Sequence, residues 1–411
     1  MNNIGNMNNK ASWKKNVILF LSSQTISLFG SMLVQYAITW HITLKTQSGI
    51  MMTIAIICGF IPTLFISFFA GVWADRYNRK MLIILSDSAI AISTLLLAVL
   101  FMMGFDAIWL LFVASAIRSF GAGVQTPAVG AFLPQIVPED RLTKVNGING
   151  SIQSLVTLVS PLLSGALLGI TTIDKIFFID VITAAIAVTI LLLFLNVPAH
   201  AKALEKTTIS YLKDMREGII YIKNHSFIKT IFIFSAFYFV LVSPLAFLTP
   251  LQVARSFGDD VWRLTTIEVA YSIGMMAGGI IIASWGGFKN RLHTMVFSNF
   301  VIAFCTLALG IITNFWIYSF LMALIGVALA IFNTPYTVLL QEKVEEDYLG
   351  RVFGVSNMIS SSIMPISMLV YGPLADIIKI EWMLIGSGLL MLVQTTLMMR
   401  NRVLIEAGKQ I

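Results

Sequence analysis

Long apolar segments alternate with short polar ones along the whole chain. The apolar runs, each of roughly 20 residues, cover 17–40, 49–73, 81–103, 107–132, 146–169, 176–197, 230–251, 267–286, 294–313, 315–338, 352–375 and 382–399. About 20 apolar residues allow a helix to cross the hydrocarbon core of a bilayer. The runs lack the residue-by-residue alternation of barrel strands, which excludes a membrane β-barrel. The pattern predicts an all-α polytopic membrane protein with twelve transmembrane helices.

Composition excludes a soluble globular protein. Of the 411 residues 57% are hydrophobic and only 11% are charged, whereas soluble domains are about a quarter charged. The formal net charge of +7 is scattered between the apolar runs, and binding of nucleic acid requires a gathered basic patch. We therefore expect the lipid bilayer, and no nucleic acid, as a partner.

Basic residues indicate the orientation of the predicted helices. With the N-terminus inside, 21 of the 27 Lys and Arg residues fall in inner segments and five in outer loops, and Arg118 lies within a run. Cytoplasmic loops carry such an excess. We expect a multi-pass protein of the cell (plasma) membrane with both termini in the cytoplasm.

The longest polar break separates two sets of six runs. It predicts an N-terminal six-helix half at 1–197, a cytoplasmic linker at 198–229 and a C-terminal six-helix half at 230–411. Within the linker, Ile209–Phe227 has apolar residues at helical spacing. This segment is either a helix lying along the inner membrane surface or an ordinary solvated linker helix.

A short repeat relates the two halves. Gln-Thr-Pro at 125–127 recurs as Asn-Thr-Pro at 333–335, and Val-Pro-Glu-Asp-Arg-Leu at 137–142 recurs as Val-Glu-Glu-Asp-Tyr-Leu at 344–349. Each copy joins the fourth and fifth run of its half. Parallel halves with a site between them are typical of secondary transporters.

The loop after the second run carries a motif that is typical of a known protein family. Gly71–Lys80 reads Gly-Val-Trp-Ala-Asp-Arg-Tyr-Asn-Arg-Lys and resembles the G-x-x-x-D-R-x-G-R-K signature of the major facilitator superfamily. Asn78 replaces the usual Gly, and because Asn tolerates a left-handed backbone better than other residues do we expect a tight turn to be kept there. We expect Asp75 to lie at the N-terminal end of a helix starting near Val352. The resemblance implies a gating motif on the inner face, formed by Gly71, Asp75, Arg76, Arg79 and Lys80.

Further segments resemble the macrolide-efflux exporters of Gram-positive bacteria within that superfamily. They are Ile-Arg-Ser-Phe-Gly at 117–121, Met-Met-Ala-Gly-Gly at 275–279 and Tyr-Leu-Gly-Arg-Val-Phe at 348–353. The resemblance implies a secondary active transporter that exports amphipathic drugs such as macrolides by proton antiport with alternating access, conferring antibiotic resistance.

Charged residues inside the runs are candidates for proton coupling. Arg118 lies near the middle of the fourth run, where a charge is costly and usually lines a cavity. Asp87 and Glu268 could carry the proton, with Glu268 preferred, because a desolvated carboxyl can exchange protons near neutral pH. The alternatives are that Arg118 is paired for packing, that Asp87 binds the gating arginines and that Glu268 caps its helix. We read Asp180, close to an outer helix start, as structural.

Polar side chains at helical spacing predict a substrate cavity. They follow one face of the first and fifth runs, and equivalent runs of the second half offer further polar and aromatic side chains. The candidates are Gln24, Ser27, Ser31, Gln35, Asn146, Asn149, Gln153, Thr157, Tyr238, Tyr271 and Asn357.

Other functional classes lack their motifs. No phosphate-binding G-x-x-x-x-G-K-[ST] loop occurs in the sequence, so ATP is not expected to power the protein, and we expect no enzyme activity, cofactor or metal. The expected partners are a small-molecule substrate and protons, and the protein is expected to be a monomer. Two other functions stay open, namely export of a native metabolite such as a siderophore or lipid-like compound and a non-transporting membrane sensor or assembly partner.

Overall fold

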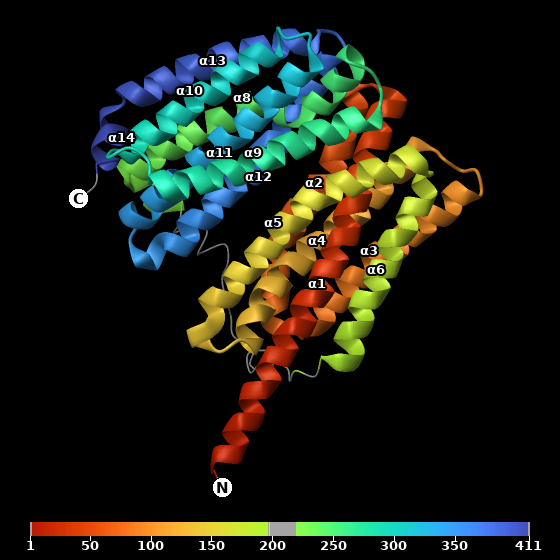
Figure 1. The fold of residues 1–411 in the computed structure, drawn as a ribbon. Coiled ribbons are helices and arrows are strands. Elements are labelled where there is room, and N and C mark those ends of the chain that lie inside the picture. The colour runs from red at the N-terminus through yellow and green to blue at the C-terminus, as the bar shows by residue number, and fades with distance from the viewer. Residues whose placement is uncertain (1, 196, 198–218, 410–411) are drawn as a thin grey trace. The chain divides into compact units, whose positions relative to one another are not determined.

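The chain folds into long helices that follow the apolar runs. The structure is a computed structural model and describes residues 2–195, 197 and 219–409. The first half contains α1 (Asn2–Thr46), α2 (Gly49–Arg76), α3 (Arg79–Met102), α4 (Ile108–Ile136), α5 (Glu139–Ile170), α6 (Ile173–Thr189) and η1 (Ile190–Phe194), a short π-helix (Figure 1).

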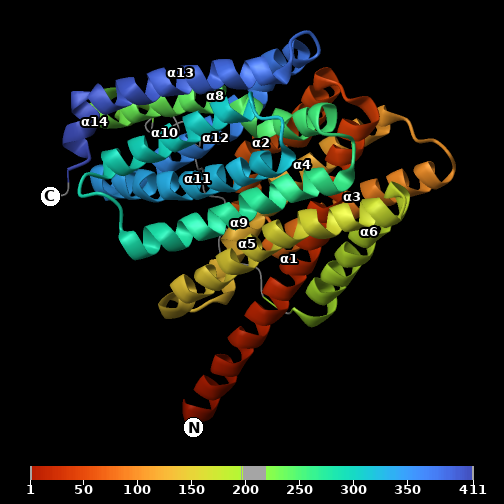
Figure 2. The same cartoon turned by 45° about the horizontal axis from the view of Figure 1, so that its top comes forward.

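The second half repeats this organisation. It contains α8 (Ser226–Ser256), α9 (Val261–Trp285), α10 (Arg291–Leu309), α11 (Phe315–Lys343), α12 (Glu346–Ala375), α13 (Ile380–Arg400) and α14 (Arg402–Ala407). Figure 2 shows α8, α10 and α13 packed side by side. Twelve helices in the described part of the chain are long and apolar enough to cross a membrane. The predicted all-α membrane fold is confirmed.

Several helices are longer than their apolar runs. The first run ends at residue 40 but α1 continues to Thr46, and the eighth run starts at 267 but α9 starts at Val261. Hydropathy detects only the part of a helix within the hydrocarbon core, whereas the headgroup region also tolerates polar residues. Residues near run edges are therefore deeper within their helices than the sequence indicated.

The chain divides into two compact units. Unit 1 is Met1–His41 with Ile57–Ile209, and unit 2 is Ile42–Ile56 with Ser210–Ile411. The placement of Ile42–Ile56 in unit 2 was not foreseen. The predicted limits of the halves and linker stay predictions, because 198–218 lie outside the described residues; the same holds for most of the expected Ile209–Phe227 helix, of which 219–224 are helical.

The sequence repeat is also a repeat of backbone structure. Val137 ends α4 with φ −110° and ψ 131°, and Val344 ends α11 with φ −100° and ψ 133°. The next residues, Pro138 and Glu345, have φ and ψ of −59° and 143°, and −60° and 141°. In each half the chain therefore makes the same extended turn from its fourth to its fifth membrane helix.

Unit 1 is held by a core that packs α1, α3, α4 and η1 together. Its buried members include Phe20, Ile83, Phe132 and Leu191, and the rings of Phe20 and Phe132 lie 4.9 Å apart. Close packing of these large side chains fixes the rotation of the helices, and so determines which residues face the interior of the unit.

In unit 2, α9 and α11 approach closely at glycines. A Cβ atom on Gly278 would lie 2.8 Å from the Cα of Val327, and one on Gly326 would lie 2.9 Å from the backbone nitrogen of Met275. Small residues allow membrane helices to pack backbone against backbone. The neighbouring Gly279 differs, because no atom lies within 4 Å of its Cβ position.

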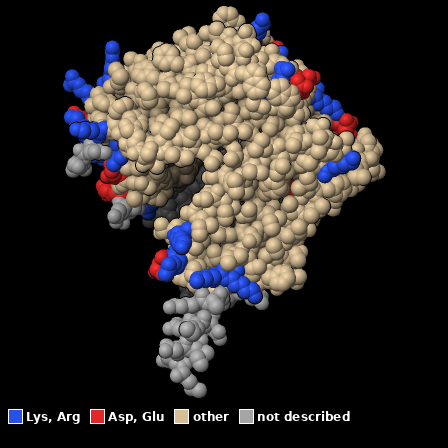
Figure 3. Space-filling view, viewed as in Figure 1, with Lys and Arg blue, Asp and Glu red and all other residues tan. Residues whose placement is uncertain are grey.

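The surface is apolar between the helix ends. Large exposed side chains include Phe65, Trp109, Ile280, Trp316 and Phe320. On the face drawn in Figure 3, Lys, Arg, Asp and Glu gather near the ends of helices and leave broad uncharged areas. Such areas would promote aggregation in water but suit contact with lipid.

The two adjacent glycines of α9 provide a matched test of the α9–α11 contact. We expect Gly278→Ala to lower the free energy of unfolding by about 1–3 kcal/mol through overpacking. Gly279→Ala should leave it unchanged or slightly raised, because Ala favours the helix. Thermal unfolding of the purified protein in detergent measures both, and equal melting temperatures for the two variants would contradict the packing described.

Candidate functional site

Three charged side chains are buried in unit 1. Among the residues that the structure describes, Asp87 on α3 is 1% exposed, Arg118 on α4 is 5% exposed and Asp180 on α6 is 0% exposed, and no other charged side chain is recorded as buried. Charges within a membrane protein are expensive and are retained where they serve a function. This cluster is the first candidate site.

Arg118 and Asp180 form an ion pair surrounded by further donors. Arg118 Nη1 donates to Asp180 Oδ2 and lies 2.5 Å from the Thr94 hydroxyl, which itself donates to Asp180 Oδ2 at 2.8 Å. Ser31 completes the group, because its hydroxyl donates to Asp180 Oδ1 at 2.9 Å and its carbonyl accepts from Arg118 Nη2 at 2.9 Å. The arginine charge is therefore neutralised inside unit 1.

The position of Asp180 corrects the sequence-based expectation. We placed it close to a helix start, but α6 begins at Ile173, so Asp180 lies about two turns into the helix. Arg118 finds its counter-charge there, and not at Asp87 or Glu268.

Asp87 has a different environment. Its Oδ1 accepts hydrogen bonds from the Ser27 hydroxyl at 2.7 Å and from Gln125 Nε2 at 2.6 Å. Its Oδ2 is buried and has no hydrogen-bond partner in the described part of the chain. Neither recorded donor is cationic, so the alternative that Asp87 binds the gating arginines is not what the structure shows. Gln125 was missed as a site residue because the sequence singled it out only as part of the repeat.

The two groups form one continuous polar ladder, by which we mean Ser27, Ser31, Asp87, Thr94, Arg118, Gln125 and Asp180. On α3, Asp87 and Thr94 are seven residues apart, as are Arg118 and Gln125 on α4. Seven residues are two turns, about 10 Å of rise, and the antiparallel helices pair Asp87 with Gln125 and Thr94 with Arg118. Ser27 and Ser31, one turn apart on α1, connect the two levels.

The predicted gating motif lies at the junction of α2 and α3. Gly71, Asp75 and Arg76 lie in the last turns of α2, and Arg79 and Lys80 begin α3. The Arg79 side chain donates to the carbonyls of Ala74 and Ala131, each at 2.9 Å, and its Nη2 lies 3.7 Å from Asp75 Oδ1. Lys80 Nζ donates to the Leu195 carbonyl at 2.7 Å. The motif thus ties this turn to α4 and to the end of η1.

The backbone of Asn78 is extended and not left-handed. Its φ is −63° and its ψ is 111°, and its side chain accepts from the Met81 amide at 3.4 Å. Asn therefore acts as the N-cap of α3, a position it favours, and the tight turn is kept, since α2 ends at Arg76 and α3 begins at Arg79. The helix that we expected to start near Val352 starts at Glu346, and its approach to Asp75 stays a prediction.

The predicted cavity residues of unit 1 fall into two groups. Ser27 and Ser31 belong to the polar ladder, and Gln24 is half-buried. The remaining residues lie at the surface of the unit, because Gln35, Asn146, Gln153 and Thr157 are exposed and Asn149 is half-buried. Farther along α5, Ser164 turns inward and donates to the Leu33 carbonyl at 3.0 Å. The first part of α5 therefore presents an exposed polar face.

The predicted residues of unit 2 are more dispersed. Glu268 is half-buried and lies about two turns into α9, whose N-cap residue is Asp260; the alternative that Glu268 caps the helix is wrong. Tyr271, also half-buried, follows one turn later. Tyr238 is buried, stacks on Phe332 with ring centroids 5.6 Å apart and has no hydrogen-bond partner for its hydroxyl among the described residues. Asn357 on α12 is exposed.

Comparison with known proteins places these features in context. The Major Facilitator Superfamily profile matches residues 17–368. The chain is 27% identical over 395 residues to Macrolide efflux protein A of Streptococcus pyogenes, covering 95% of this chain and 97% of that protein. It is 22% identical over 364 residues to the Staphyloferrin A transporter of Staphylococcus aureus, covering 88% and 90%. The crystal structure of the nucleoside transporter NupG shares its fold, with a TM-score of 0.68 at 16% identity over 94% of this chain and 98% of that one.

Because Arg118 and Asp180 form an ion pair, replacing one of them should affect stability differently from replacing both. Arg118→Gln or Asp180→Asn alone leaves one buried charge without its partner, which costs about 3–5 kcal/mol. The double variant removes both charges and should recover most of that loss. Thermal unfolding in detergent measures all three, and a double variant less stable than either single variant would contradict the pairing.

Proposed function

Because this chain belongs to the major facilitator superfamily of membrane transporters, we propose that it exports amphipathic small molecules of the macrolide type in exchange for protons. The resemblance seen in Gly71–Lys80 is thereby confirmed at the level of the family, and the protein is a multi-pass membrane transporter and not an enzyme. Similarity to Macrolide efflux protein A over 95% of the chain is the observation that carries the proposed substrate class.

The exposed face of α5 supports a path for amphipathic molecules. Asn146, Gln153 and Thr157 supply hydrogen-bonding groups on that face. Apolar side chains such as Leu155 are exposed on the same helix. A molecule with both polar and apolar parts requires such a mixed wall. In unit 2 the half-buried Tyr271 and the neighbouring Met275 would add adaptable apolar contacts.

The surroundings of Asp87 support proton coupling at this residue. Arg118 is already neutralised by Asp180, so the ladder offers no spare positive charge to hold an ionised Asp87. Burying an unpaired carboxylate is costly, whereas the neutral acid is tolerated much better. When the surroundings of such a carboxyl change so that its charged form is stabilised, it releases its proton, and it takes one up when they change back.

Glu268 is the other candidate for the coupling acid. It lies in unit 2 on the same face of α9 as Tyr271, one turn away, and it is half-buried. A carboxylate near aromatic rings also suits a positively charged drug. If Asp87 carries the proton and Glu268 contacts a positively charged drug, replacing each acid by its neutral amide should affect transport differently.

Orientation and gating complete the proposal. We infer that both termini are cytoplasmic, because the inner segments hold 21 of the 27 basic residues. The gating motif then lies on the cytoplasmic side, where Arg79 and Lys80 fix the α2–α3 turn to the rest of unit 1. The transporter is proposed to act as a monomer.

A native metabolite is the second candidate substrate. The 22% identity to the Staphyloferrin A transporter over 88% of the chain favours a siderophore-like molecule within this class. A non-transporting sensor is less well supported, since it would need neither the buried polar ladder nor the exposed polar face of α5.

Export is tested in a drug-sensitive bacterial host. Cells that express the chain should accumulate less erythromycin and less ethidium than cells with an empty vector, and a protonophore should remove the difference. Equal accumulation in all conditions would contradict drug export, and growth of a deletion strain under iron limitation then tests the metabolite alternative.

The role of the two acids is tested by neutral variants of similar size. If Asp87 carries the proton, Asp87→Asn abolishes efflux driven by a pH gradient in vesicles, while Glu268→Gln retains it. The Asn side chain can still accept from Ser27 and Gln125, so folding should be preserved. The opposite pattern would assign coupling to Glu268, and retained coupling in both variants would contradict both assignments.

A further inference from the structure

The turn between α9 and α10 in unit 2 carries a group of exposed aromatic side chains. Trp285 ends α9 and is 43% exposed, Phe288 in the turn is 42% exposed, and Phe297 on α10 is 49% exposed. The ring centroids of Trp285 and Phe288 are 4.8 Å apart, and those of Phe288 and Phe297 are 6.0 Å apart. Both pairs meet edge to face, which is a favourable arrangement, so the three rings form one apolar surface.

Backbone geometry and hydrogen bonds fix the shape of this turn. Gly286 and Gly287 have φ of 76° and 83°, a left-handed conformation that Gly adopts without strain. The Phe288 amide donates to the Thr294 hydroxyl at 2.9 Å, and the Asn290 side chain is the N-cap of α10. The exposure of the Phe288 ring is therefore built into the turn.

Basic side chains adjoin the same turn. Lys289 and His293 are exposed, and His293 lies one helical turn before Phe297 on the same face of α10. The C-terminal segment adds Lys409, which is also exposed and whose backbone forms an antiparallel bridge with Asn290. Two lysines and a histidine from segments far apart in the chain are thus brought to the aromatic turn.

Acidic residues are scarce around this turn. The sequence has no Asp or Glu between Glu268 and Glu342, and Glu342 is bound by Arg291, whose Nη2 lies 2.5 Å from Glu342 Oε1. After residue 381 the sequence has one acid, Glu406, and three basic residues. Within the described residues neither of the two lysines has a recorded ion pair. The surface of the turn is therefore positively charged.

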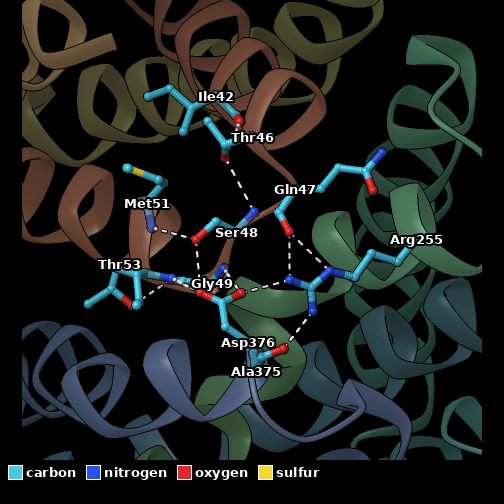
Figure 4. A network of polar contacts seen from close by, with 11 residues as sticks. Ile42, Thr46, Gln47, Ser48, Gly49, Met51, Thr53, Arg255, Ala375 and Asp376 are labelled. Atoms are coloured by element: carbon cyan, nitrogen blue, oxygen red, sulfur yellow. Dashed lines mark hydrogen bonds and ion pairs between the residues drawn. The ribbon is translucent and has the colours of Figure 1, made fainter.

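The opposite end of α9 also carries aromatic rings, but the arginines there are paired with carboxylates. Trp262 is 46% exposed, and the guanidinium of Arg263 lies 5.2 Å from the centroid of its ring. Arg263 Nε lies 3.4 Å from Asp260 Oδ2. Arg255, in the last turn of α8, donates to Asp376 Oδ1 at 2.8 Å (Figure 4). These two arginine charges are thereby neutralised within the protein.

The carboxylate that pairs with Arg255 is held in its charged form. Asp376 accepts from the amides of Gly49 at 2.7 Å and Ile50 at 3.0 Å. Partial burial by itself raises the pKa of this carboxyl, but the donors from Gly49, Ile50, Ser48 and Arg255 outweigh it and hold the pKa below its ordinary value. Asp376 is therefore ionised throughout the neutral pH range, and the difference in charge between the two ends of α9 persists there.

The length of α9 brings the aromatic turn to the level of lipid headgroups. Trp262 and Trp285 are the second and the last of its 25 residues, so they are separated by about 35 Å of helix rise. The hydrocarbon core of a bilayer is about 30 Å thick, and Trp is enriched at both of its interfaces. On α10, Phe297, Phe304 and Ile311 are exposed at intervals of two turns, a face that suits contact with lipid tails.

We propose that this surface binds the headgroup of an anionic phospholipid. It is formed by Trp285, Phe288, Lys289, His293, Phe297 and Lys409, and we name it the aromatic–basic surface. Lysine ammonium groups bind phosphate as point charges, the imidazole of histidine can donate a hydrogen bond, and the rings contact the upper part of the acyl chains. A zwitterionic headgroup has no net charge to match the two lysines. This inference requires only that the protein lies in a membrane, and it does not depend on transport, on the substrate or on proton coupling.

The first test measures the affinity for lipid. Purified protein in detergent is titrated with phosphatidylglycerol or with phosphatidylcholine of identical acyl chains, and native mass spectrometry follows the tightest binding event. Lys289→Gln with Lys409→Gln should weaken binding of phosphatidylglycerol about thirtyfold, roughly fivefold for each lysine, and leave binding of phosphatidylcholine unchanged. Lys175→Gln with Lys379→Gln removes two other exposed lysines and is the matched control. Equal affinity of the two double variants for phosphatidylglycerol would overturn the proposal.

The second test locates the bound lipid. Bromine atoms on an acyl chain quench the fluorescence of a nearby tryptophan, and the difference between unmodified protein and Trp285→Phe isolates the signal of Trp285. In bilayers, brominated phosphatidylglycerol should quench Trp285 roughly fivefold more strongly than brominated phosphatidylcholine at the same low mole fraction, the enrichment expected from one lysine. Trp262, isolated with Trp262→Phe, should be quenched equally by both lipids. Equal quenching of Trp285 by both lipids would overturn the proposal, and so would quenching by neither, which would show that protein covers the surface.

Discussion

An arginine in the middle of a membrane helix requires a counter-charge, and the arrangement of unit 1 follows from that requirement. Arg118 on α4 is neutralised by Asp180 on α6, and Thr94 on α3 and Ser31 on α1 complete the group. The pair thereby fixes four helices relative to one another. It also leaves Asp87, two turns along the ladder, with hydrogen-bond donors but no recorded cationic partner, which is why we place proton exchange there.

The two units differ in how they are stabilised. In the described residues the buried charges all belong to unit 1, whereas unit 2 combines glycine contacts between α9 and α11 with hydrogen bonds from the first amides of α2 to Asp376 at the end of α12. Both the predicted gating motif and the hydrogen bonds of Asp376 lie at helix ends, where backbone groups have no partner within the helix. Arg79 and Lys80 bind free carbonyls, and Asp376 binds free amides. Contacts of this kind can be exchanged for water without unfolding a helix.

Sequence patterns predicted the membrane helices and the repeat because both depend on local composition. They also identified Arg118 as costly, since a charge in an apolar run is visible in the sequence. Its partner could not be identified from the sequence, because the pairing of Arg118 with Asp180 depends on the rotation and depth of two helices that are far apart in the chain. Asp180 seemed peripheral only because hydropathy placed the helix start too late. For Asn78, the sequence indicated a tight turn, but its role as the N-cap of α3 could be seen only in the backbone and the side-chain hydrogen bond. No local sequence pattern indicates that residues 42–56 belong to unit 2.

The central claim is that Asp87 exchanges a proton while Asp180 is held by Arg118. Proton release on substrate addition tests it most directly, with purified protein in weakly buffered detergent solution, erythromycin as the substrate and a pH-sensitive dye as the detector. We expect release from the unmodified protein, release from Glu268→Gln and none from Asp87→Asn. Undiminished release from correctly folded Asp87→Asn protein would contradict it.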